Sequence, residues 1–96
     1  METSPARILA VRGDSMRPLL KAGDLILVRR AALSELSPGD LVVLMDWRGE
    51  GADCVVHRLF GRAGAGGSLR ALTKGDANLL PDPPTPESGI VGAVAA

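Results

Sequence analysis

Apolar residues in this chain occur in short runs of four to six, and glycine, proline or aspartate separates one run from the next. Two examples are Leu-Ile-Leu-Val at 25–28 and Leu-Val-Val-Leu-Met at 41–45. Runs of this length between turn-forming residues favour β-strands, because helices need longer periodic segments. We therefore expect a mainly β chain with at most one short helix. Its strands should pair antiparallel, since the connections are too short for crossover helices.

The order of runs and breaks predicts one domain over residues 1–96. The predicted strands cover residues 8–12, 25–30, 41–46, 54–62, 69–74 and 90–94. The turn and loop signals between them are the Ser-Pro-Gly-Asp turn at 37–40, a hairpin loop at 48–51, a glycine-rich loop at 63–68 and an extended loop with four prolines at 76–88. Residues 15–18 should form a turn or a short helical piece. Pro18 disfavours a helical conformation at Arg17, so a longer helix is not expected there.

The composition excludes several classes of protein. Hydrophobic residues make up 46% of the chain, enough for a packed core, but aromatic residues make up only 2%, too few to stack on single-stranded nucleic acid. Eleven basic and eleven acidic residues cancel, so no net field attracts nucleic acid or an anionic membrane. Cys54 is the only cysteine, which excludes an intrachain disulfide and fits a reducing compartment.

The sequence also contains no recognisable membrane or targeting segment. No apolar run approaches the roughly 20 residues that a spanning helix needs. The first residues, Met-Glu-Thr-Ser-Pro, have no basic region ahead of an apolar stretch, as a signal peptide would. These features predict a soluble, cytoplasmic protein.

Four residues are candidates for a catalytic site, namely Ser15, His57, Asp76 and Asp82. Ser15 follows Gly-Asp, where a sharp turn can lift a side chain out of a strand. A serine hydroxyl needs an adjacent base to become a nucleophile, and His57 is the only histidine. A carboxylate on the second ring nitrogen would fix the tautomer of the imidazole, and Asp76 and Asp82 could each supply it.

Each of these residues alone has a structural interpretation. A serine beside glycine and aspartate is usually a turn residue, and a histidine in the apolar stretch 54–60 is usually half-buried with a hydrogen-bond partner. Asp76 is typical of a turn, and Asp82 lies in a proline-rich loop. The functional interpretation therefore depends on the residues as a set.

As a set, the residues resemble the type I signal peptidases, in the archaeal, sporulation-associated and endoplasmic-reticulum branch that uses histidine in place of lysine. The motifs that carry the resemblance are Gly-Asp-Ser-Met-Arg-Pro at 13–18, Gly-Asp-Leu-Ile-Leu-Val at 23–28, Val-Val-His-Arg at 55–58, Thr-Lys-Gly-Asp-Ala-Asn at 73–78, and Asp82. The resemblance covers about residues 11–92. It implies a coiled, half-barrel sheet of the kind shared with LexA-type peptidases.

The resemblance also implies roles for the candidate residues. Ser15 corresponds to the nucleophile and His57 to the base, and Asp82 ranks above Asp76 as the carboxylate that supports the base. The substrate class is a precursor peptide or protein that is cut after small residues. We expect no cofactor, no metal and no nucleotide.

The chain departs from the family pattern in three places. It carries no membrane helix, so either a membrane or processing-complex partner anchors it or its substrates are soluble. Gly13 occupies a position where bacterial members often place a serine that helps to bind the oxyanion. The loop after His57 is short and rich in glycine, which leaves no room for a large recognition insertion.

Two alternatives remain at this point, a non-catalytic peptide-binding module of the same fold and a fragment of a LexA-like self-cleaving regulator. The second predicts a DNA-binding helix pair and a lysine base, and neither is evident. The glycine-rich segment 61–67 lacks the lysine and hydroxyl residue of a phosphate loop. Lys74 fits a solvated strand end better than a base, and the spacing of Cys54 and His57 does not favour a metal site.

Overall fold

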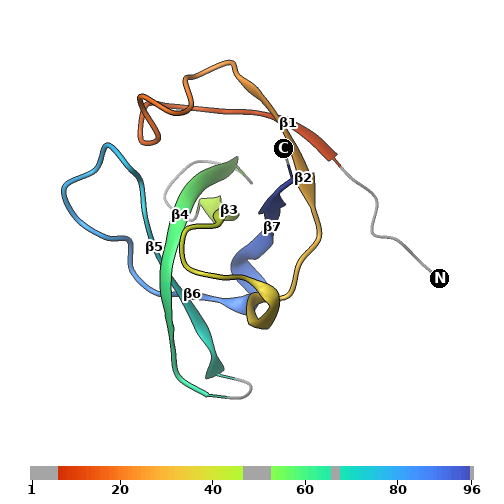
Figure 1. The fold of residues 1–96 in the computed structure, drawn as a ribbon, viewed down its shortest axis with the longest axis vertical. Helices are drawn as coiled ribbons and strands as arrows, with labels where there is room; N and C mark the ends of the chain where they lie inside the picture. Colours follow the sequence, from red (N-terminus) through yellow and green to blue (C-terminus); the bar gives the residue numbers. More distant parts are fainter. Residues whose placement is uncertain (1–6, 47–52, 66–67, 96) are drawn as a thin grey trace.

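The computed structural model describes residues 7–46, 53–65 and 68–95, and its strands form one curled antiparallel sheet (Figure 1). The strand order across the sheet is β1-β2-β7-β3-β4-β5-β6. The strands are β1 (Arg7–Ala10), β2 (Leu25–Arg29), β3 (Leu41–Asp46), β4 (Asp53–Ala63), β5 (Arg70–Lys74), β6 (Thr85–Pro86) and β7 (Ile90–Val94). Two three-residue 3₁₀ turns, η1 (Leu33–Glu35) and η3 (Glu87–Gly89), complete the described elements.

Strand β3 lies near the middle of the sheet because both of its faces are apolar. Val42 and Leu44 join a core cluster with side chains of η1, β4, β5 and β7, whereas Val43 joins a second cluster with side chains of β2 and β4. Successive residues of a strand point to opposite faces, so a flat sheet would leave one cluster in water. The curl of the sheet covers both clusters.

Irregular pairing accompanies this curl. The register shifts between Val43 and Leu44 where β3 meets β7, and between Leu59 and Gly61 where β4 meets β5. Such bulges bend a strand and increase its local twist. The mainly β, antiparallel half-barrel that the sequence predicted is confirmed.

The structure refines several predicted boundaries. β1 ends at Ala10 and not at residue 12, because the backbone of Val11 bonds to Asp24 and Gly23 in the following loop. The loop predicted for 76–88 contains β6, which pairs with β5, and η3. The hairpin loop predicted at 48–51 lies outside the described residues. Within the described ranges, no helix is long and apolar enough to cross a membrane.

Candidate functional site

The loop between β1 and β2 carries Ser15. Gly13 has a φ of +74°, a left-handed conformation that side chains disfavour, and it reverses the chain two residues before the serine. Hydrogen bonds from Arg17 N to Asp14 O (3.1 Å) and from Leu20 N to Met16 O (2.9 Å) close the turns that follow. Met16, only 1% exposed, anchors the loop against the rest of the molecule. Ser15 is consequently held half-buried on a fixed turn.

His57 lies on β4 with 3% of its surface exposed, opposite Val42 of β3. Its ring stands between two of the predicted site residues. The Nε2 atom lies 3.0 Å from Ser15 Oγ, and the Nδ1 atom lies 2.5 Å from Asp82 Oδ2. The structure therefore brings Ser15, His57 and Asp82 into one hydrogen-bonded series, although the three are separated by 42 and 25 residues along the chain.

Asp82 is held in this position by β5. Its backbone N–H donates to Thr73 O (2.9 Å), and the Thr73 hydroxyl donates to Asp82 Oδ2 (2.7 Å). Thr73 is completely buried. Thr73 is a site residue that the sequence motifs did not predict. A hydroxyl in the apolar strand that precedes the Lys-Gly-Asp segment is the signal that could have indicated it, because a buried hydroxyl needs a hydrogen-bond partner.

The hydrogen-bonded series defines proton positions. An ionised carboxylate can only accept hydrogen bonds, so Asp82 requires the proton of a neutral imidazole to sit on Nδ1. The lone pair on Nε2 then faces Ser15, whose hydroxyl donates to it. In this state the ring is oriented to take a proton from Ser15.

Asp76, the other candidate carboxylate, binds a different partner. Its two oxygens accept from Arg58 Nε (3.0 Å) and Nη2 (2.8 Å), while Arg58 Nη1 donates to Gly39 O (2.9 Å). No hydrogen bond joins Asp76 to His57 among the described residues. The paired guanidinium lowers the pKa of Asp76 and the same hydrogen bonds raise the pKa of Arg58, in both cases against the opposing effect of burial.

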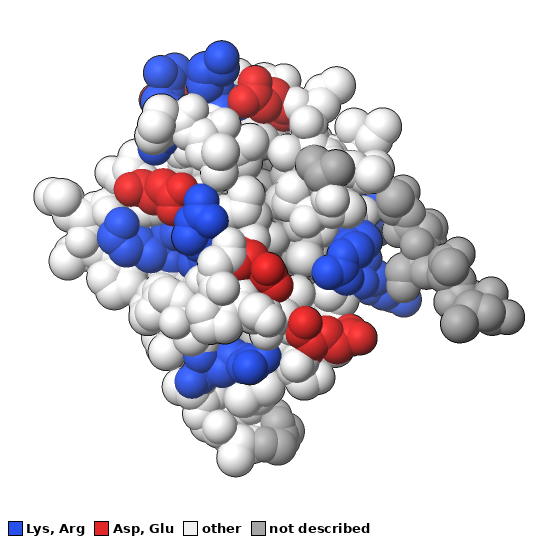
Figure 2. Space-filling model, viewed as in Figure 1, with Lys and Arg blue, Asp and Glu red and all other residues white. Residues whose placement is uncertain are grey.

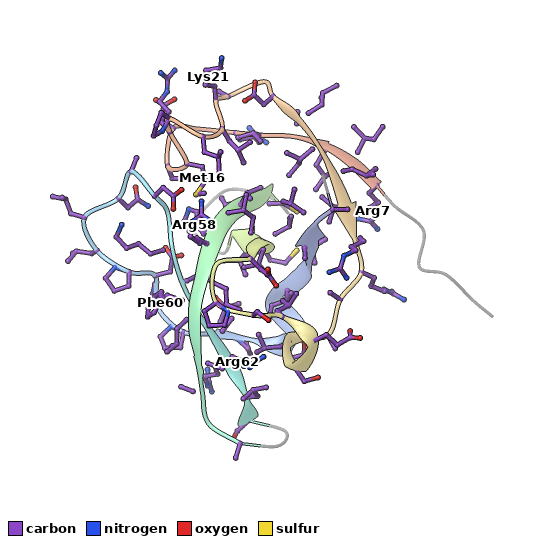
Figure 3. All side chains as sticks on the ribbon, viewed as in Figure 1. Arg7, Met16, Lys21, Arg58, Phe60 and Arg62 are labelled. Atoms are coloured by element: carbon purple, nitrogen blue, oxygen red, sulfur yellow. The ribbon has the colours of Figure 1, made fainter. Side chains whose placement is uncertain are left out.

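The turn that contains Asp76 also forms hydrogen bonds to the Ser15 loop. Ala77 N donates to Ser15 O (2.8 Å), and Asp76 N contacts Met16 Sδ at 3.3 Å. A Cβ on Gly75 would lie 2.8 Å from Ser15 O and 2.9 Å from Ser15 Cβ, so only glycine permits this approach. Figure 3 shows Met16 and Arg58 close together on the left of the molecule. Asp76 thus supports the position of Ser15 through its turn.

We expect Asp76→Asn to lower the free energy of unfolding at pH 7 by less than about 1 kcal/mol, because the ion pair is partly exposed, with side chains 38% and 27% accessible. A carboxyl whose pKa falls on folding stabilises the protein above its unfolded pKa of about 3.9 and loses this effect as pH falls through the lower folded value. The difference between the wild type and the variant should therefore shrink below about pH 4. Urea unfolding of both proteins at neutral and acidic pH measures this difference in the free energy of unfolding. A difference that is the same at both pH values would exclude the ion pair as its source.

A hollow lies beside the N-terminal half of β4. It has a volume of about 200 Å³. Its lining residues are Leu9, Ala10, Val11, Arg12, Ile26, Val43, Cys54 and Val56. Most of them are apolar, and they come from the segments on either side of the Ser15 loop, from β3 and from β4 just before His57. The hollow therefore offers space for a small apolar group.

Comparison with known proteins relates the chain to peptidases. A family model described as Peptidase S24-like matches residues 1–78, which include Ser15 and His57 but not Asp82. The chain is 40% identical to the signal peptidase complex catalytic subunit sec11 of Sclerotinia sclerotiorum over 81 residues, which are 82% of this chain and 45% of that protein. It is 36% identical to the sec11 subunit of Neurospora crassa in an alignment 103 residues long that covers 97% of this chain and 58% of that protein. The chain thus spans about half the length of these curated relatives. No solved structure gives a significant match.

Proposed function

Since the chain belongs to the Peptidase S24-like family and is similar to signal peptidase catalytic subunits, we propose that it is a serine endopeptidase that removes a leader or signal segment from a precursor. The observation that carries this proposal is the hydrogen-bonded series of Ser15, His57 and Asp82. A nucleophile, a base in reach of it and a carboxylate behind the base form the arrangement that acyl transfer by serine requires.

The proposed reaction begins when His57 Nε2 accepts the Ser15 proton as Oγ attacks the peptide carbonyl carbon. The Ser15 N–H donates to no described residue, so it is available to the oxyanion that forms. His57 then gives the proton to the departing amine as the C–N bond breaks. Water, deprotonated by His57, hydrolyses the acyl-enzyme and returns Ser15 to its starting state. Asp82 stabilises the imidazolium during both steps.

The substrate would bind as an extended chain next to β1 and the first half of β4. Main-chain pairing at a strand edge supplies affinity, and shallow pockets for alternate side chains supply selectivity. The 200 Å³ hollow near Val11 and Cys54 suits a small side chain, in agreement with the cleavage after small residues that the resemblance implied.

The relatives' printed names describe subunits of a signal peptidase complex, so a processing-complex partner belongs to the same proposal. Such a partner would anchor the chain peripherally to a membrane. A free cytoplasmic enzyme acting on soluble precursors is the other form that the sequence analysis predicted. Both forms use the same site.

Incubation with precursor peptides tests this function. The peptides should carry small residues before the expected cleavage point, and mass spectrometry should read the products. Cleavage at one bond after a small residue, with both fragments recovered, is the expected result. Peptide that binds but stays intact would instead identify a non-catalytic binding module. Cleavage only within the chain itself would identify a LexA-like regulator.

A further inference from the structure

The face near the N-terminal end of β1 contains a second hollow, of about 420 Å³, that the proposed reaction does not use. Three arginines, Arg7, Arg29 and Arg30, contribute to its lining. Its remaining wall is apolar and includes Val28 of β2 with Ile90 and Val91 of β7. We call this site the arginine hollow. Figure 2 shows basic side chains gathered on the right of this view, where Figure 3 labels Arg7.

The charges of the arginine hollow are not neutralised within the described part of the chain. No described acidic residue lines it, and none pairs with Arg7, Arg29 or Arg30. Other arginines differ in this respect, since Arg17 pairs with Asp14 and Arg58 pairs with Asp76. Three like charges around one concavity repel each other and attract an anion.

The arginine hollow is built on paired strands, so its shape is stable. Val28 is only 2% exposed, and Arg29 of β2 pairs with Ala93 of β7. A Cβ on Gly92 would lie 2.2 Å from Arg29 O, so the glycine allows β7 to approach β2 closely at this point. Antiparallel pairing of β1 with β2 places Arg7 opposite Val28. Residues that are distant in the sequence therefore meet on one rigid framework.

We propose that the arginine hollow binds a phosphate monoester. Guanidinium groups match phosphate oxygens in geometry, and three of them can balance a charge of about −2, whereas a single carboxylate needs only one partner. The volume exceeds that of a bare phosphate and falls in the range of about 300–1,000 Å³ typical of small-molecule sites. The apolar wall of Val28, Ile90 and Val91 can contact the carbon part of the ester.

The arginine hollow lies away from the hydrogen-bonded series of Ser15, His57 and Asp82, although its Arg7 belongs to β1, along which the proposed substrate would extend. Figure 3 places Arg7 on the right of the molecule and Met16, the residue after Ser15, on the left. The arginine hollow shares no lining residue with the hollow beside β4. Phosphate binding there would thus act on where the protein is held or on its stability, and the proposal does not depend on peptidase activity.

Titration of the full chain with glycerol 3-phosphate, followed by NMR of backbone amides, tests the proposal. We expect saturable shifts at β2 and β7 with a dissociation constant in the millimolar range. Arg7→Gln, Arg29→Gln and Arg30→Gln together should weaken binding at least about tenfold, and each alone about two- to fivefold, as for exposed ion pairs. Glutamine keeps much of the side-chain length, and the single variants serve if the triple variant does not fold.

Arg70→Gln is the matched control, because it removes one exposed arginine of β5 that does not line the arginine hollow. Its affinity should equal that of the wild type. Sedimentation with phosphatidylcholine vesicles, with and without phosphatidic acid, distinguishes the sources of the phosphate. Arginine-dependent binding to phosphatidic acid identifies a lipid headgroup, whereas binding to glycerol 3-phosphate alone identifies a soluble ester. No saturable binding in either arm, equal weakening by Arg70→Gln, or equal binding of acetate would overturn the proposal.

Discussion

Ser15→Ala is expected to reduce peptide cleavage by a factor of about 10³ to 10⁶, while the variant keeps its fold and still binds peptide. Ser15 Oγ lies 3.0 Å from His57 Nε2 and is the atom that attacks the peptide carbonyl carbon in the proposed reaction. Removing it leaves His57 and Asp82 in place but leaves no nucleophile. The ratio of initial rates, measured by mass spectrometry on one precursor peptide, gives the size of the effect.

Ser34→Ala provides the control for this loss. Ser34 is an exposed serine in η1, so its replacement also removes one hydroxyl, at a place outside the hydrogen-bonded series. Its cleavage rate should match that of the wild type. Peptide binding by Ser15→Ala, measured by fluorescence anisotropy, should change by less than about tenfold, because the hydroxyl contributes mainly to the transition state. A Ser15→Ala enzyme that cuts at the wild-type rate would refute the mechanism.

Asp82→Asn is expected to lower kcat by about 10³ to 10⁴ with little change in KM. An amide has nearly the shape of a carboxylate, but its NH₂ group can donate to Nδ1 and so place the ring proton on Nε2. His57 would then present a proton, and not a lone pair, to Ser15. The Thr73 hydroxyl bonds the same Oδ2 atom, and in the variant it can accept the second N–H of the amide instead, so the fold should persist.

Asp76→Asn is the comparison variant for Asp82→Asn. Both substitutions remove one carboxylate from the loop between β5 and β6. The Asp76 side chain, however, bonds to Arg58 and not to the imidazole. Asp76→Asn should therefore lower kcat much less, and mainly through a less stable Ser15 loop. If the two variants lost equal activity, or if Asp76→Asn lost more, the assignment of Asp82 as the supporting carboxylate would be wrong.

Much of the fold could be predicted from the sequence because apolar runs and turn residues act locally. The Pro-Gly-Asp turn before β3 and the glycine-rich loop after β4 mark strand ends by backbone preference alone. The short strand β6 was not predicted, because two residues with proline carry no alternation and pair only when β5 is already in place. Strand order in the sheet also depends on long-range packing that local patterns do not encode.

In the candidate site, too, local motifs could be predicted from the sequence and long-range contacts could not. Ser15, His57 and Asp82 could be named from ordered motifs, but choosing between two carboxylates six residues apart required a view of their partners. The Arg58 guanidinium binds the Asp76 carboxylate, and the Thr73 hydroxyl donates a hydrogen bond to the Asp82 carboxylate. Neither contact follows from sequence spacing, since each depends on how β4, β5 and the following loop pack together.

The carboxylate comes from the loop between β5 and β6, and the turn at its start also holds the Ser15 backbone. Under the proposed mechanism, a chain that has been synthesised only as far as β4 would contain both the serine and the histidine and yet be inactive. Synthesis of β5 and of the loop that follows it would bring Asp82 to His57 and switch the enzyme on. A single cut by another protease beside Leu79, which is 96% exposed, would switch it off again.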